Sequence, residues 1–223
     1  MRRAVWLSLL GLALVPSPAS AGGTVEVQIK LPAPQKIDTT GMNRLMVGGF
    51  RTNDHPTLDL DREINRSLRD LLRRNTRFEI LEIEPLPLPE QPIDEAIRNT
   101  AYWKRIGARF GADVIVAGTL DFTSRDQSGF VQEDFISELT GQRVRRTRWI
   151  ERESFKMDLG LYLFRGSSGD LLYEDHFTEE MALDGKGADG LSVLHQLVER
   201  VGEGVLTILT PRTRIETRHL FTE

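Results

Sequence analysis

Residues 110–120 read FGADVIVAGTL, and this stretch decides the fold. Ala112 to Leu120 is a near-continuous apolar run, as a strand needs when both of its faces are buried. The preceding residues 93–110 repeat apolar side chains at helical spacing, and Gly111 stands where such a helix would end. A helix followed directly by a buried strand indicates a crossover between parallel strands. The sequence therefore predicts an α/β architecture around this strand.

The chain before this stretch predicts a strand, a helix and a second strand. Leu45–Phe50 is a compact apolar run, Asp59 or Asp61 would begin the helix, and apolar residues then recur at helical spacing. Residues 77–83 alternate polar and apolar side chains, which favours a strand. Residues 84–92 contain four prolines and predict an extended loop, because proline interrupts helices and central strands.

The chain after it predicts an antiparallel hairpin and a last helix. Residues 154–164 alternate in polarity, Gly166–Asp170 would form the turn, and Leu171–Phe177 would be the returning strand. Residues 191–209 carry the apolar spacing of an amphipathic helix, which Pro211 would end. We therefore expect an α/β (α+β) fold with a mixed sheet of five or six strands and three helices. The polar, turn-rich residues 124–142 are expected to form a loop between strands.

The amino terminus has the layout of a secretory signal peptide. Two arginines precede an apolar stretch of 12 residues, and Ala19-Ser20-Ala21 matches a cleavage site. A membrane anchor is the alternative, but a spanning helix needs about 20 apolar residues. We expect cleavage after Ala21 and a periplasmic or secreted protein. Its parts would be an N-terminal arm at 22–43, one α/β domain at 44–210 and a tail at 211–223.

Composition excludes several classes of protein. The 223 residues include no cysteine, which excludes disulfide frameworks, thiol catalysis, zinc ribbons and a lipid carried on cysteine. The formal net charge is −4, and removal of residues 1–21, with two arginines and no acid, leaves a net charge of −6. Because nucleic-acid binding depends largely on positive charge, an acidic chain is not expected to bind nucleic acid.

Three segments together resemble a known group of periplasmic domains. Residues 110–120, the opening strand at 45–50 with its helix, and the hairpin LGLYLFRGSSGDLL at 159–172 are similar to the CsgG-like curli-secretion lipoprotein family and to the amino-terminal domain of the Tol–Pal propeller protein. The resemblance spans roughly residues 44–209 and rests on fold motifs. The chain departs from these proteins in lacking a lipobox cysteine and a propeller. The resemblance implies a non-catalytic envelope domain that binds other proteins.

A basic cluster is the first candidate binding surface. Its members are Arg143, Arg145, Arg146 and Arg148, with Trp149 beside them. Strand alternation would place the first two arginines on one face and the last two on the other. One interpretation is a charged edge strand that guards against unwanted pairing. The other is a patch for an envelope protein or for peripheral contact with an anionic membrane surface.

Tyr102 and Trp103 form the second candidate binding surface. They lie in the predicted helix after the proline-rich loop, where aromatic residues at helical spacing usually pack into the core. If either side chain were exposed, it would be an anchor for a partner, since aromatic residues dominate binding hot spots.

No residue pattern singles out a catalytic or metal site, and no cofactor is predicted. The histidines are His55, His176, His195 and His219. Their spacing forms neither a metal-binding motif nor a triad. Residues 126–134 lack the oxygen spacing of an EF-hand, and Gly48-Gly49 lacks the lysine of a phosphate loop. A periplasmic hydrolase is the alternative hypothesis, with His176 and either Asp126 or Glu133 as its acid–base residues.

Together these observations favour a non-catalytic, exported module that binds envelope proteins. A homo-oligomer is left open, and a small-ligand-binding domain is a further alternative. If the strands at 114–122 and 154–164 extended past the domain edge, residues 124–142 and the arginine cluster would form the presented surface.

Overall fold

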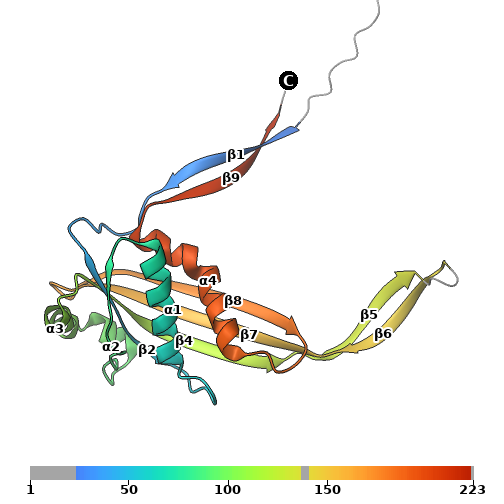
Figure 1. Ribbon diagram of the computed structural model, residues 1–223, viewed down its shortest axis with the longest axis horizontal. Helices are drawn as coiled ribbons and strands as arrows, with labels where there is room; N and C mark the ends of the chain where they lie inside the picture. Colours follow the sequence, from blue (N-terminus) through green and yellow to red (C-terminus); the bar gives the residue numbers. More distant parts are fainter. Residues whose placement is uncertain (1–23, 137–140, 222–223) are drawn as a thin grey trace, which may run out of the picture. The chain divides into compact units, whose positions relative to one another are not determined.

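The computed structural model describes residues 24–136 and 141–221. Residues 33–212 form one unit built on a mixed sheet of five strands in the order β3-β2-β4-β7-β8 (Figure 1). The strands are β2 (Arg44–Thr52), β3 (Glu79–Leu81), β4 (Val114–Asp126), β7 (Arg152–Arg165) and β8 (Leu171–Asp184). β2 runs parallel to β3 and β4, whereas the β4–β7 and β7–β8 pairs are antiparallel. The predicted fold class and the crossover into β4 are therefore confirmed.

Two helices, α1 (Leu60–Asn75) and α4 (Gly190–Leu209), cover one face of this sheet (Figure 1). α1 begins where predicted, because the Asp59 carboxylate accepts a hydrogen bond from the Arg62 backbone N–H (3.2 Å). The apolar stripes of both helices are buried with alternate residues of β4 and β7 in one cluster. These side chains form the larger of the two cores.

The opposite face is covered only in part, by α2 (Ile93–Arg98), α3 (Thr100–Phe110) and the proline-rich segment before them. A single helix was predicted over residues 93–110, and this prediction is wrong. Asn99 has a non-helical backbone (φ −78°, ψ 70°), and its side chain accepts from the Tyr102 N–H (3.0 Å), so it ends α2 and caps α3. The unit therefore has four helices. Gly111 ends α3 in the left-handed conformation (φ 63°), as expected.

Residues 124–142 do not form the predicted loop in their described part. β4 continues to Asp126, and β5 (Gly129–Ile136) then pairs with β6 (Arg143–Ile150) in a separate antiparallel sheet of two strands. We call this pair of strands the ribbon. Figure 1 shows it continuing beyond the end of β4 and β7. No simple alternation marked these strands, because neither face of the ribbon is buried against a core.

A second unit contains β1 (Thr24–Ala33) and β9 (Arg212–Phe221), which pair with each other and run in opposite directions (Figure 1). The segment expected as a C-terminal tail thus forms a strand over residues 212–221. The predicted signal peptide at residues 1–21 lies outside the described residues. Among the described helices, none combines the length and the apolar character that crossing a bilayer would require.

Candidate functional site

Exposed apolar side chains concentrate on the ribbon. Seven large apolar side chains are exposed in the described part of the chain. Five of them lie on the ribbon, namely Phe130, Phe135, Ile136, Val144 and Trp149. An isolated two-stranded sheet is marginally stable in water, and clustered exposed apolar groups mark surfaces that bind something. The ribbon is therefore the first candidate for a functional surface.

The register of the ribbon places apolar groups on both of its faces. Phe130 lies opposite Trp149, and their rings meet edge to face with centroids 5.0 Å apart. Phe135 lies opposite Val144 on the other face. Neither face has a covering element among the described residues. A partner that encloses the ribbon would therefore bury apolar surface on both sides.

The four arginines of the predicted cluster make up half of β6, and all four side chains are exposed. Arg145 pairs with Asp134 across the ribbon (3.1 Å), and Glu133 pairs with Arg148 and, at 4.0 Å, with Arg146. Arg143 has no ion-pair partner among the described residues. Four arginines against two carboxylates leave the described ribbon positive. The partner-binding role assigned to these arginines and to Trp149 stays a prediction.

Sequence reasoning missed the other apolar residues of the ribbon, because it treated residues 124–142 as a loop. One signal was available in the charges. Glu133-Asp134 and Arg145-Arg146 lie at positions that a hairpin places directly opposite each other, and the structure pairs them in that register. Opposite charges on facing residues stabilise a pair of strands. Two adjacent acids followed later by two adjacent arginines can face each other in a hairpin, so this pattern indicates one.

The second predicted surface is divided between core and surface. Trp103 is 3% exposed, stacks on Phe164 with centroids 3.9 Å apart, and donates its indole N–H to the Ala96 carbonyl (2.8 Å). It is a core residue and does not offer a surface to a partner. Tyr102 is half-buried, and its hydroxyl donates to the Pro87 carbonyl (3.1 Å). Burial raises the pKa of the Tyr102 hydroxyl. Trp103 thus fixes α2 against the sheet, and Tyr102 contacts the proline-rich segment.

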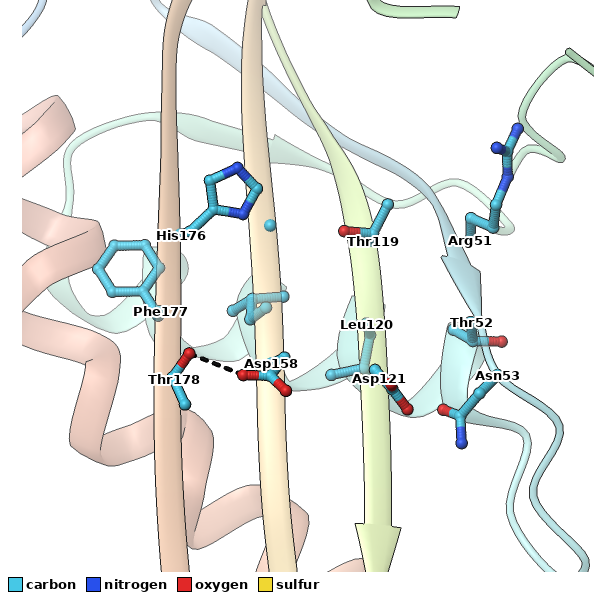
Figure 2. Close-up of a pocket in the computed structure, with 12 residues that line it drawn as sticks. Arg51, Thr52, Asn53, Thr119, Leu120, Asp121, Asp158, His176, Phe177 and Thr178 are labelled. Atoms are coloured by element: carbon cyan, nitrogen blue, oxygen red, sulfur yellow. Dashed lines mark hydrogen bonds between the residues drawn. The ribbon is translucent and has the colours of Figure 1, made fainter. Parts of the chain in front are cut away.

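The uncovered half of the sheet carries a hollow of about 380 Å³ with both polar and apolar lining (Figure 2). Its lining comes from β2, β4, β7 and β8, and includes Arg51, Asn53, Thr119, Asp121, Asp158 and His176. Gly160 forms its floor between Thr119 and His176, which are its partners on the two neighbouring strands. A Cβ atom there would lie 2.6 Å from the Thr119 hydroxyl, so the absence of a side chain keeps the hollow open.

The Asp158 carboxylate in the hollow is paired within the sheet. Lys156 Nζ lies 2.7 Å from the Asp158 carboxylate, and the Thr178 hydroxyl donates to it at 2.7 Å (Figure 2). These bonds, first that of Lys156, hold the pKa of Asp158 below its ordinary value. Asp158 is thus an ionised, engaged carboxylate rather than a free general acid. Across residues 24–136 and 141–221, no three His, Asp or Glu side chains are placed to hold a metal ion.

The hydrolase hypothesis needed His176 to meet Asp126 or Glu133, and this prediction is wrong. His176 lies in the row of Thr119, whereas Asp126 is seven residues further along β4, about 23 Å at 3.3 Å per residue. Asp126 pairs instead with Lys186 (3.0 Å), and Glu133 lies further away on the ribbon. These three side chains therefore do not form one catalytic site.

A serine–histidine contact joins α1 to α4. The Ser67 hydroxyl lies 2.7 Å from Nδ1 of His195 and donates to the Glu63 carbonyl (2.9 Å), while Glu63 Oε2 lies 4.0 Å from His195 Nε2. Sequence reasoning missed this group, because its members come from two helices far apart in the chain. Ser67 is only 7% exposed, so a substrate carbonyl has no access to its hydroxyl. The group connects two helices and is not a nucleophilic site.

Comparison with known proteins finds a likeness of fold. No protein-family model and no curated protein matches this sequence. The PelC dodecamer structure from Paraburkholderia phytofirmans is 13% identical with a TM-score of 0.42, over 85% of this chain and 99% of that chain. The LpoB C-terminal domain from Salmonella enterica is 12% identical with a TM-score of 0.36, over 62% of this chain and 85% of that chain. Lipoprotein GNA1162 from Neisseria meningitidis is 11% identical with a TM-score of 0.38, over 73% of this chain and 97% of that chain. We carry no function over from these proteins, and membership of the curli-secretion family stays a prediction.

Proposed function

We propose that this chain is an exported, non-catalytic protein-binding module of the cell envelope, and that it engages its partner through the ribbon. One observation carries the proposal: Phe130 is 76% exposed and Trp149 is 51% exposed on a pair of strands that no other described element covers. Leaving such side chains in water forgoes the free energy that their burial would release. A bound partner would recover it.

The chemistry of the ribbon supports a protein as the partner. Aromatic residues and arginine are the types most enriched in the energetic centres of protein interfaces, and the ribbon presents both. Its free strand edges also offer backbone N–H and C=O groups to an added strand. The proposed location rests on the signal-peptide pattern of residues 1–21, and the non-catalytic role rests on the separation of His176 from Asp126 and Glu133.

Photo-crosslinking in intact cells tests the proposal. A photoreactive residue replaces Gln132 on the ribbon, and a matched control replaces Arg66, which is exposed on α1. We expect a discrete adduct from position 132 and none from position 66. The adduct is identified by mass spectrometry, and its binding is measured with purified components. In that assay Phe130→Ser with Trp149→Ser should weaken binding at least tenfold, since aromatic hot spots each contribute about 2 kcal/mol or more.

Two controls accompany this test. Ile215→Ser removes an exposed apolar residue outside the ribbon and should leave binding unchanged. The amino terminus of the exported protein should be Gly22, as found by mass spectrometry. Equal adducts from positions 132 and 66, or none from either in correctly exported protein, would contradict the ribbon as the binding surface. A retained Met1 would contradict export.

A second candidate function is the binding of a small polar ligand in the hollow of Figure 2, because its volume suits a compact molecule. A thermal-shift screen of small polar compounds tests this function, since a ligand of the native state raises the melting temperature. Thr119→Val, which removes one hydroxyl from the wall, should reduce such a shift. A shift that Thr119→Val leaves unchanged would place the ligand elsewhere.

A further inference from the structure

β8 is an uncovered edge of the five-stranded sheet. It pairs with β7 on one side, and no described strand pairs with its other side over 14 residues. Two local bonds touch its backbone, one from Arg200 to the Glu180 carbonyl (3.2 Å) and one from the His176 N–H to the Asp175 carboxylate (3.0 Å). The opposite edge, β3, has only three residues. β8 is thus the long edge of this sheet to which a strand can be added.

β8 is also strongly acidic. Its acidic residues are Glu174, Asp175, Glu179, Glu180 and Asp184, and it contains no lysine or arginine. Asp175 pairs with Lys36 (2.9 Å), and Asp184 pairs with Arg152 (3.0 Å). Glu174 and Glu179 have no ion-pair partner among the described residues, and register places them on opposite faces of the sheet. An added strand would therefore meet unpaired negative charge on both faces.

β6 has the complementary character. It carries four arginines in eight residues, and arginines occur on both of its faces. Like charges on facing strands oppose pairing, so β8 is guarded against β8 of another copy, and β6 against β6. β5 is a weaker target than β8, because Glu133 and Asp134 are already paired with arginines of their own ribbon. Among these edges, unpaired charges of opposite sign, namely Arg143 on β6 against Glu174 and Glu179 on β8, meet only when β6 faces β8.

We propose that the ribbon of one copy of this chain binds the β8 edge of a second copy, with β6 adding as a strand beside β8. The proposal rests on the proposed function and names the ribbon's partner as the chain itself. The two surfaces differ, so the interface is head to tail, and each copy keeps a free ribbon or a free edge until a ring or filament forms.

Disulfide scanning tests the strand pairing directly, because the chain has no cysteine of its own. One variant set carries Arg146→Cys or Thr147→Cys, adjacent residues on opposite faces of β6. The other carries a single cysteine at one of the positions 174–180 of β8. Purified mature variants are mixed in pairs and oxidised. For a given β6 cysteine we expect crosslinked dimers at one β8 position, and at an adjacent position for the other β6 cysteine, since a disulfide requires Cα atoms about 4.4–6.8 Å apart.

Two further cysteine positions serve as controls. Ile215→Cys, exposed on β9, should not crosslink with either β6 cysteine. Gln132→Cys on β5 tests direct pairing of two ribbons. Crosslinking of β6 to position 132 in place of β8, or to position 215 as readily as to β8, would overturn the proposal.

A charge exchange tests the recognition. Glu174→Arg with Glu179→Arg reverses the unpaired acids of β8. Arg143→Glu with Arg146→Glu removes the net positive charge of β6 and keeps the closer pairs of Arg145 and Arg148. By sedimentation velocity, each double variant alone should self-associate at least tenfold more weakly than the unchanged chain. Mixing the two should restore a heterodimer, because the unchanged β6 of the β8 variant then meets the unchanged β8 of the β6 variant.

The outcomes separate this inference from the proposed function. Restoration on mixing requires both variants to be folded, so misfolding cannot imitate the expected result. An unchanged chain that stays monomeric at tens of micromolar would overturn the inference. If the adduct from position 132 then contains a different protein, the ribbon would still be the binding surface and only its assigned partner would be wrong.

Discussion

Phe122 and Phe130 lie eight residues apart along β4 and β5, yet the first is fully buried and the second is 76% exposed. Both come from antiparallel pairs in regular register. The difference lies in what covers them. α1 and α4 pack over β4 and β7, whereas no described helix or strand packs over the ribbon. The same backbone geometry therefore serves stability in one region and leaves side chains available in the other.

Whether an apolar residue on a strand stabilises the fold depends on whether another element packs over it. In the sheet, alternate residues of β7 stabilise the domain by packing against the helices. In the ribbon, the same residue types gain little from one another, because two strands alone bury little surface. The exposure of these apolar side chains on the ribbon is consistent with a surface that becomes buried on association.

Truncation of the two phenylalanines should have very different effects on stability. Phe122→Ala should lower the free energy of unfolding by about 3–5 kcal/mol, because it opens a cavity beside Phe155. Phe130→Ala should change it by less than about 0.5 kcal/mol, as surface substitutions do. Urea unfolding at low protein concentration measures both, since self-association would add stability. A loss of several kcal/mol for Phe130→Ala would show that the ribbon is part of the folded core.

Two glycines give the next largest difference. A Cβ atom on Gly118 of β4 would lie 2.1 Å from the Gly160 carbonyl oxygen, so Gly118→Ala must separate the strands and should cost about 1–3 kcal/mol. At Gly129 of β5 no heavy atom lies within 4 Å of the added carbon. Gly129→Ala should therefore leave stability unchanged or raise it by up to about 1 kcal/mol, by restricting the unfolded chain. Thermal unfolding of the two variants measures the contrast, and equal losses would contradict it.

The sequence predicted the covered region well and the uncovered region poorly. The runs at 45–50 and 112–120 located β2 and β4, and Asp59 and Gly111 located helix ends, because burial on one or both faces imposes a pattern on the sequence. The ribbon is not buried on either face by a described element, so no such pattern of apolar residues marks its strands. The division at Asn99 was missed because the apolar spacing of α2 and α3 is continuous across it, and only the backbone shows the change.

The candidate sites were likewise only partly predictable from the sequence. The arginine cluster was visible as composition, but its position on a free strand depends on pairing with β5. The hollow in Figure 2 is lined by side chains that are distant in the sequence, such as Arg51 on β2 and Thr178 on β8. Only the sheet order brings them to one hollow, and no local motif encodes that order.

Polar contacts provide a smaller test of the same comparison. Ser67→Ala removes a partly buried hydrogen bond between Ser67 and His195, which joins α1 to α4, and should cost about 1 kcal/mol. Arg145→Ala removes an ion pair with Asp134 in which the arginine side chain is 68% exposed, and should cost a few tenths of a kcal/mol. Urea unfolding of the two variants side by side measures the difference. A larger loss for Arg145→Ala would mean that the ribbon has a buried environment even in the single chain.

The smallest effect is expected where the two regions join, at Asp126, the last residue of β4. Hydrogen bonds from Ser128, and then the ion pair with Lys186, hold the pKa of the Asp126 carboxyl well below its usual range. A lowered pKa means that the ionised form stabilises the fold above the ordinary value of 3.8. This contribution is lost as pH falls from that value through the lowered pKa.

Asp126→Asn should therefore slightly lower stability at pH 7 and make the acid side of the stability curve shallower below about pH 4. The effect is small because the carboxylate is exposed and screened by water. Unfolding curves between pH 2 and pH 7 measure it, with Asp134→Asn on the ribbon as the matched control. Because the Asp126 contacts hold the junction, amide exchange at Gly129 should rise in Asp126→Asn while exchange at Val116 stays slow. Equal acceleration at Val116 would show that the junction and the covered sheet open as one unit, and the two regions would then share a single stability.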